Sequence, residues 1–120
     1  MTAKYDFKLN QGTDLVVPFS LSDESGKPCN LLGFTAQMQL RVNGATGKLV
    51  DTFTTENGGF LMEADKGVLS LVFKHEKTSQ YPATCLVYDI ELVSTDGNIT
   101  RIVEGKITVS PEVTRVELSN

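Results

Sequence analysis

The sequence predicts an all-β fold, an antiparallel β-sandwich of about seven to eight strands with at most one short helical turn. Three observations predict this fold. Apolar residues recur at every second position through most of the chain, which is the pattern of half-buried strands. Turn-forming residues interrupt these runs at intervals of about 8 to 12 residues. No apolar pattern with the period of a long helix competes with the strands.

The N-terminal third contains three alternating runs. Residues 5–9 and 15–21 alternate on either side of a glycine-containing turn, and each is predicted to be a strand. Pro18 lies inside the second run, and because proline cannot donate a backbone hydrogen bond, we expect a sheet edge or a bulge there. After the polar turn at 23–28, residues 34–42 give the clearest alternation in the chain.

The middle of the chain predicts shorter strands. Glycine-bearing turns separate residues 48–55, 60–63 and 68–73, and each segment is predicted to be a strand, the second of them only briefly paired. Between residues 74 and 79 the alternation stops. The sequence Lys-His-Glu-Lys-Thr-Ser there is compatible with about one helical turn, which Pro82 would end.

The last two strands are predicted to form a hairpin. Residues 86–92 alternate, an Asp-Gly-Asn turn follows at 96–98, and residues 99–109 return as the longest strand. Within this last strand Ile102 breaks the parity of the apolar residues, and Gly105 leaves one position without a side chain. We therefore expect a β-bulge near Gly105.

The length, 120 residues, is enough for one domain and too little for two. We expect the sandwich to span residues 1–110 and residues 111–120 to form a C-terminal arm. A formal net charge of -4 and a pI near 4.9 argue against nucleic-acid binding, which needs clustered Lys and Arg. Because the sequence contains neither an apolar membrane span nor a secretory signal, we expect a protein made in the cytosol with free thiols at Cys29 and Cys85.

Residues that could carry chemistry are few and scattered. His75 is the only histidine, and it lies in the most polar connection, where we expect a solvated side chain rather than a catalytic group. One histidine and two distant cysteines do not predict a zinc site. Asp89 and Glu91 share a strand face, and we expect cross-strand charge pairs with Arg101 and Lys106 rather than glycosidase chemistry. The sequence therefore predicts no enzymatic activity, no metal and no cofactor.

Three segments of the chain match a known pattern. The first is LGFTAQMQLR at 32–41, and the second is TTENGG at 54–59. The third and most specific comprises VYDIEL at 87–92, DG at 96–97, TR at 100–101, EG at 104–105 and VSPEVTR at 109–115. Together they resemble a family of small immunoglobulin-like structural proteins of tailed bacteriophages, and the layout is similar to the N-terminal domain of upper baseplate proteins in phages of Gram-positive hosts. Leu32 replaces the usual polar residue before Gly33, a departure confined to that turn.

The resemblance implies an immunoglobulin-like β-sandwich that serves as a non-enzymatic structural component of the virion, in a tail, baseplate or collar. Its partners would be other phage structural proteins and further copies of itself, as a homo-oligomer within the virion, with neither nucleic acid nor membrane involved. It would be made in the host bacterial cytoplasm. The alternatives are a capsid decoration protein and a module that binds host glycans, for which exposed aromatic side chains such as Tyr81 and Phe60 would be the sign.

Contacts between subunits are expected at the edges of the sandwich. An edge strand has unpaired backbone groups that can accept a strand or a terminal arm from a neighbour. We expect the C-terminal arm to become ordered on a neighbouring subunit, so that loss of residues 112–120 would leave the fold intact and weaken assembly. The candidate contact residues are Tyr5, Phe7, Pro18, Val113, Val116 and Leu118.

Overall fold

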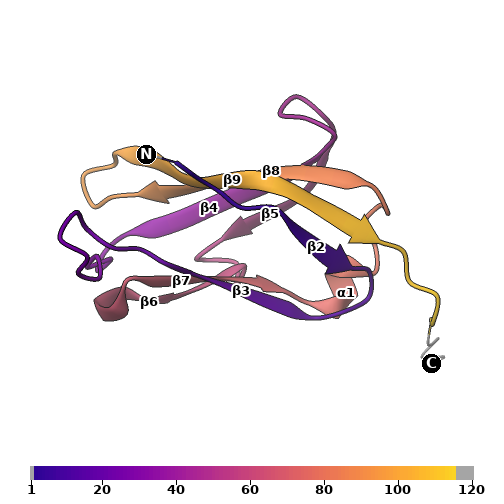
Figure 1. Cartoon of the computed structure of the whole chain (residues 1–120), viewed down its shortest axis with the longest axis horizontal. Coiled ribbons are helices and arrows are strands. Elements are labelled where there is room, and N and C mark those ends of the chain that lie inside the picture. Colours follow the sequence, from indigo (N-terminus) through magenta and orange to yellow (C-terminus); the bar gives the residue numbers. More distant parts are fainter. Residues whose placement is uncertain (1, 116–120) are drawn as a thin grey trace.

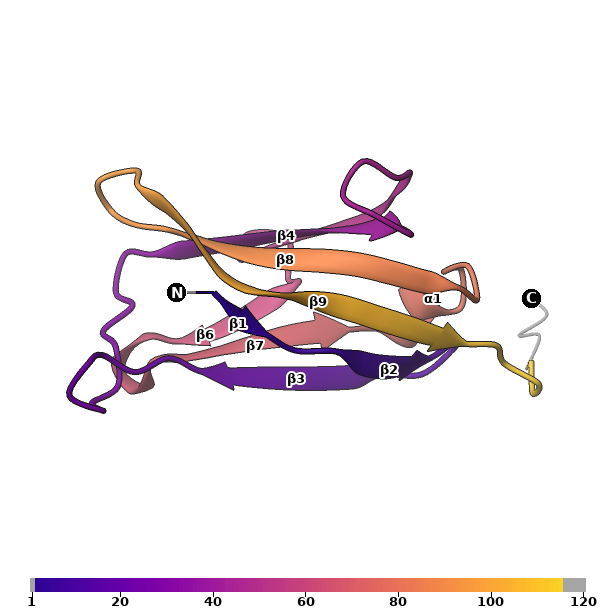
Figure 2. The ribbon, with the colours of Figure 1, turned by 45° about the horizontal axis from the view of Figure 1, so that its top comes forward.

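The computed structural model describes residues 2–115. The chain forms two β-sheets that pack face to face, and the predicted all-β sandwich is confirmed (Figures 1 and 2). The strands are β1 (Ala3–Lys4), β2 (Phe7–Asn10), β3 (Leu15–Ser20), β4 (Thr35–Val42), β5 (Leu49–Thr54), β6 (Phe60–Glu63), β7 (Val68–Phe73), β8 (Cys85–Val93) and β9 (Ile99–Ser110).

Helical structure in residues 2–115 is confined to two short turns. One is α1 (His75–Thr78), which is the turn expected between residues 74 and 79. The other is a 3-10 turn, η1 (Ala64–Lys66), between β6 and β7, where the sequence predicted only a glycine-bearing turn. Gly67 ends it in the left-handed conformation, which glycine adopts at little steric cost. Within this part of the chain no helix is long and apolar enough to cross a membrane.

The larger sheet has the strand order β1-β9-β8-β4-β5, with β2 also paired to β9, and the smaller sheet has the order β3-β7-β6. The two alternating runs at the N-terminus therefore belong to different sheets. All pairings are antiparallel except those of β1 and β2, which run parallel to β9. The first strand thus joins the last strand of the chain, a long-range pairing that local alternation could not predict.

The core lies between the inner faces of the two sheets. Strand β4 illustrates why, because Ala36, Met38 and Leu40 are buried while the intervening Gln37 and Gln39 are exposed. Each large apolar side chain that is fully buried in this way stabilises the fold by roughly 1.5–3 kcal/mol. Phe73 on β7 lies among three other aromatic rings in edge-to-face contact, those of Phe7, Phe53 and Tyr81.

The bulge in β9 lies at Ile102, so the position predicted near Gly105 is wrong. Val103 is opposite Ile90 and Arg101 is opposite Glu91, which leaves Ile102 as the extra residue. Gly105 keeps the regular register. The interruption of the apolar alternation at Ile102 therefore marks the bulge. The glycine at position 105 has a different explanation.

Gly105 makes room for Tyr5 and Asp6, which connect β1 to β2 along the same edge of β9. A Cβ atom at Gly105 would collide with the carbonyl oxygen of Tyr5. The same carbonyl accepts a hydrogen bond of 2.6 Å from the hydroxyl of Tyr88, and Asp6 Oδ1 accepts one of 2.8 Å from the backbone N–H of Lys106. The expected strand at residues 5–9 is therefore found as β2, which starts at Phe7, and Tyr5 and Asp6 form the link to the additional short strand β1.

Cys29 and Cys85 are both free thiols, as expected. Cys29 lies in the connection between β3 and β4, and Cys85 is the first residue of β8.

We predict that Gly105→Ala destabilises the fold by about 1–3 kcal/mol, because the added methyl group meets backbone atoms of Tyr5 that are held by the hydrogen bonds of Tyr5 and Asp6. Urea unfolding would measure the loss. Gly44→Ala is the matched control, since a Cβ atom there meets nothing within 4 Å. Equal unfolding free energies for the two variants would contradict the assigned role of Gly105.

Candidate functional site

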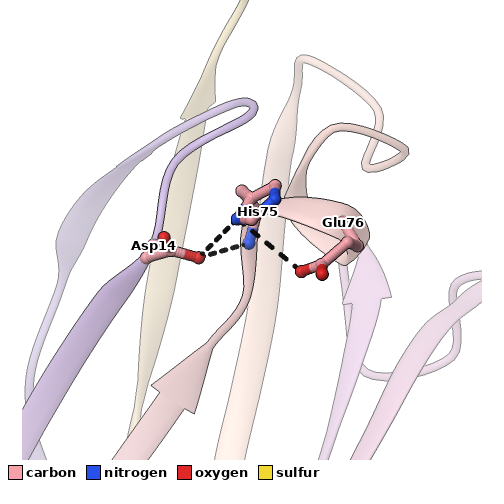
Figure 3. A group of neighbouring side chains, drawn as sticks. All are labelled: Asp14, His75 and Glu76. Atoms are coloured by element: carbon pink, nitrogen blue, oxygen red, sulfur yellow. Dashed lines mark hydrogen bonds and ion pairs between the residues drawn. The ribbon is translucent and has the colours of Figure 1, made fainter. Parts of the chain in front are cut away.

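His75 lies at the start of α1 and meets two carboxylates. Asp14, the residue before β3, accepts a hydrogen bond of 2.6 Å from the backbone N–H of His75, and the same oxygen lies 3.0 Å from Nδ1 of the ring (Figure 3). Glu76 Oε1 lies 3.6 Å from that ring nitrogen. All three side chains are exposed. Asp14 therefore joins the connection after β2 to the helical turn after β7.

The electrostatics of this cluster favour a charged pair. The hydrogen bond to Asp14 is the main cause that raises the pKa of His75 above its ordinary value of 6.5, and the negative charge of Glu76 adds to it. The hydrogen bond from the backbone N–H of His75 is the main cause that lowers the pKa of Asp14 below 3.8. A raised histidine pKa stabilises the fold fully below about pH 6.5, and this contribution disappears as the pH rises through the folded-state pKa. The lowered carboxyl pKa stabilises the fold above about pH 4, and this contribution disappears as the pH falls through its folded-state pKa.

The chemistry available to this cluster is limited. One ligand atom from each of Asp14, His75 and Glu76 lies within 4.8 Å of the other two, so the three could face one divalent cation. A metal needs a neutral imidazole, however, and the two carboxylates favour the protonated one. His75 is exposed, as the sequence predicted, but its partner Asp14 was missed because 61 positions separate the two residues.

The outer face of the larger sheet is polar and slightly hollow, with a volume of about 680 Å³. Its side chains pair with one another. Arg101 Nε lies 3.3 Å from Asp89 Oδ2, which confirms the expected cross-strand pair. Glu91 accepts a hydrogen bond of 2.8 Å from Gln37, whereas Lys106, expected as a charge partner, makes no ion pair within residues 2–115. Exposed pairs of this kind stabilise a fold by about 0–1 kcal/mol each.

A second, smaller hollow of about 170 Å³ lies beside Tyr81 and Asp51. The hydroxyl of Tyr81 donates a hydrogen bond to Asp51, and Lys77 Nζ lies 3.1 Å from the same carboxylate. Burial, with the hydrogen bond to Asp51, raises the pKa of Tyr81 well above its usual range. Tyr81 and Phe60, the two aromatics considered for a sugar-binding surface, are both buried. Tyr81 thus connects β5 to the segment after α1 rather than facing solvent.

Two of the predicted contact residues close one side of the sandwich. Tyr5 is 46% exposed, and its ring stacks on Phe7 at 5.5 Å and meets the edge of Phe19 at 5.8 Å. Phe7 is half-buried and also contacts Phe73. These rings span the gap between β2 in the larger sheet and β3 in the smaller one. Part of Tyr5 remains exposed and is available for contact, whereas Phe7 packs mainly against the core of the sandwich.

The predicted contact residues near the C-terminus lie beyond β9. Val113 is 93% exposed. Val116 and Leu118 lie outside the described residues. The structure thus places one of these three side chains, and places it in solvent.

Pro18 lies on an edge strand, as predicted. Within residues 2–115, β3 pairs with β7 alone. Just after β3, the backbone N–H of Leu21 donates to the carbonyl of Gly67, on the side of β7. Because backbone groups alternate in direction along a strand, those of Val17 and Phe19 also face β7, and those of Pro18 face the free edge. At this edge no described strand needs the N–H that proline lacks.

The edge at β5 is closed by side chains, in contrast to the edge at β3. Asp51 Oδ1 accepts a hydrogen bond of 2.8 Å from the backbone N–H of Thr52. Asn57 accepts one of 2.9 Å from the N–H of Thr54 and donates one of 3.0 Å to the carbonyl of Thr52. These bonds satisfy the outward-facing backbone groups in the second half of β5. The free edge of β3 is therefore the better candidate for backbone contact with a neighbour.

We predict that the imidazole of His75 titrates above pH 6.5, and that Asp14→Asn lowers its pKa because the amide removes both the charge and the strongest acceptor. Because His75 is the only histidine, its Hε1 resonance can be followed by NMR without assignment ambiguity. Glu63→Gln, which alters a pair with Lys66 elsewhere on the surface, is the control and should leave the titration unchanged. An unchanged pKa in Asp14→Asn would contradict the pairing.

No protein-family model matches this chain, and no curated protein matches it. A crystal structure of a chicken TCR is similar in fold, with a TM-score of 0.56 at 12% sequence identity. The alignment covers 96% of this chain and 56% of the receptor chain, so this protein spans little more than half of its neighbour's length. At this identity the likeness concerns the fold alone. Together with the two-sheet topology, it establishes an immunoglobulin-like β-sandwich.

Proposed function

We propose that the protein is a non-enzymatic structural component of a tailed-bacteriophage virion, in a tail, baseplate or collar, and that it acts through contacts between subunits. The sequence segments at 32–41, 54–59 and 87–115 support the proposal through their resemblance to phage structural proteins. The free edge of β3 is the structural observation that carries it, because an unpaired edge is a ready site for a neighbouring chain.

Several carboxylates on the surface already have partners within the fold, which supports this proposal. Asp89 and Glu91 are paired across the larger sheet, and Asp51 holds Tyr81 and Lys77. Asp14 is bound to the backbone and ring of His75. Each arrangement stabilises an element of the sandwich. We propose that the surface holds neighbours through many weak contacts rather than through one chemical site, and that the symmetry of an assembly multiplies them.

The start of the C-terminal arm is fixed to the sandwich. The backbone N–H of Glu112 donates a hydrogen bond of 2.9 Å to Gln11 Oε1, and Gln11 Nε2 donates one of 2.8 Å to the carbonyl of Tyr81. Val113, the next residue, is almost fully exposed. We propose that the segment from Val113 onward contacts a neighbouring subunit from this fixed point.

We predict that a chain ending at Glu112 folds with an unchanged melting temperature and loses the ability to assemble, because the hydrogen bond that fixes Glu112 is retained. Calorimetry would measure the melting temperature, and co-sedimentation with particles lacking the protein would measure assembly. The full-length chain is the control. An unfolded truncated protein would contradict the independence of the sandwich, and normal assembly would contradict the role of the arm.

Electron microscopy of purified virions tests the proposed function directly. We expect copies of this chain in a ring or collar of the tail structure. Copies on the capsid surface would favour the alternative of a decoration protein. Absence of the chain from intact particles would overturn the proposal.

A further inference from the structure

The outer face of the smaller sheet is apolar. The buried, inward-facing residues of this sheet include Val17 on β3, Leu69 and Leu71 on β7 and Phe60 on β6. The residues next to them along each strand therefore point outward. The outward residues form what we call the apolar face: Val16, Pro18 and Ser20 on β3, Val68, Ser70 and Val72 on β7, and Leu61 and Glu63 on β6. Within this face Val72 is buried and Val68 and Ser70 are half-buried, so the exposed surface lies mainly over β3 and β6. Val16 is 55% exposed and Leu61 is 62% exposed.

The two outer faces of the sandwich differ in chemistry. The outer face of the larger sheet carries Gln, Arg, Asp, Glu, Lys and Thr side chains. The apolar face carries one charged residue, Glu63, at its end. An antiparallel sheet that faces water on one side normally alternates apolar and polar residues, and the smaller sheet departs from this rule on its solvent side. No described element covers this side of the sheet (Figures 1 and 2). Depletion of charge around exposed apolar side chains is characteristic of the centre of a protein interface.

We propose that the apolar face packs against the same face of a second copy of this chain, related by a two-fold axis. The net charge of -4 would oppose self-association through most of the surface, but the centre of this face is uncharged and does not repel its own copy. The register of the three strands is compatible with such a contact. The row Pro18, Ser70 and Leu61 places a small side chain between two larger ones, so Leu61 of each copy can lie over Ser70 of the other.

The size of the face makes this contact weak. The face consists of three strands spaced about 4.8 Å apart, each with about five residues at about 3.3 Å per residue. Its footprint is therefore roughly 250 Å² per copy. Two copies would bury about 500 Å², whereas stable dimers bury at least about 1,200 Å². We therefore expect only weak association in solution, and occupation of the face where copies are held close together.

The experiment uses the isolated full chain, so its result does not depend on where the chain lies in a virion. Amide NMR spectra recorded from about 0.1 to about 3 mM would reveal concentration-dependent shifts, expected at Val16, Ser70 and Leu61. Because the contact is apolar, sodium sulfate should strengthen it, whereas a contact made by ion pairs would weaken with added salt.

Leu61→Glu is the test variant, and we expect it to raise the dissociation constant at least about tenfold, because two carboxylates would be desolvated at the centre of the contact. Leu49→Glu is the matched control. Leu49 is 43% exposed on β5 of the other sheet, so the substitution makes the same change of charge away from the apolar face. Val16→Thr, which keeps the size of the side chain and adds a hydroxyl, is a second test and should weaken the contact in a chain that folds normally.

The NMR results would distinguish a contact through the apolar face from the alternatives. Shifts confined to the apolar face, lost in Leu61→Glu and kept in Leu49→Glu, would support the proposal. Spectra that do not change with concentration, or shifts that map to the polar face, would overturn it. Electron microscopy of the virion tests the proposed function separately, so either proposal can fail alone.

Discussion

The packing of the two inner sheet faces against each other is the interaction on which the rest of this protein depends. It fixes which side of every strand faces water and therefore where each polar group lies. Phe73 and the aromatic rings around it fill the space that the two sheets enclose. Polar networks such as that of Asp51 and Tyr81 form at the margins of this core, where they connect segments that the sheets do not pair.

Alternation alone predicted most of the strands, because each side chain's environment is set by its own position in a pleated strand. It could not predict the parallel pairing of the first strand with the last, since that depends on residues about a hundred positions apart. Gly105 shows the same limit. Its missing side chain was visible in the sequence, but its cause, the carbonyl of Tyr5 passing over it, is a tertiary contact.

The candidate surfaces were predictable to different degrees. Pro18 marked an edge strand because its missing N–H is a property of the residue itself. The charge pair between Asp89 and Arg101 followed from strand alternation and the hairpin turn. The partnership of Asp14 with His75, and the hydrogen bonds that close the edge at β5, depend on where connections fold back, and no local pattern encodes them.

The parallel pairing of β1 and β2 with β9 has a mechanical consequence. Because the pairing is parallel, β1 begins at one end of the sandwich and β9 finishes at the other, and the N-terminal strands are hydrogen-bonded to β9 between these points (Figure 1). A tensile force applied between the ends would load these backbone hydrogen bonds together, in shear, instead of opening them one at a time. A sandwich connected in this way should resist a pulling force better than one whose terminal strands can be peeled off one bond at a time.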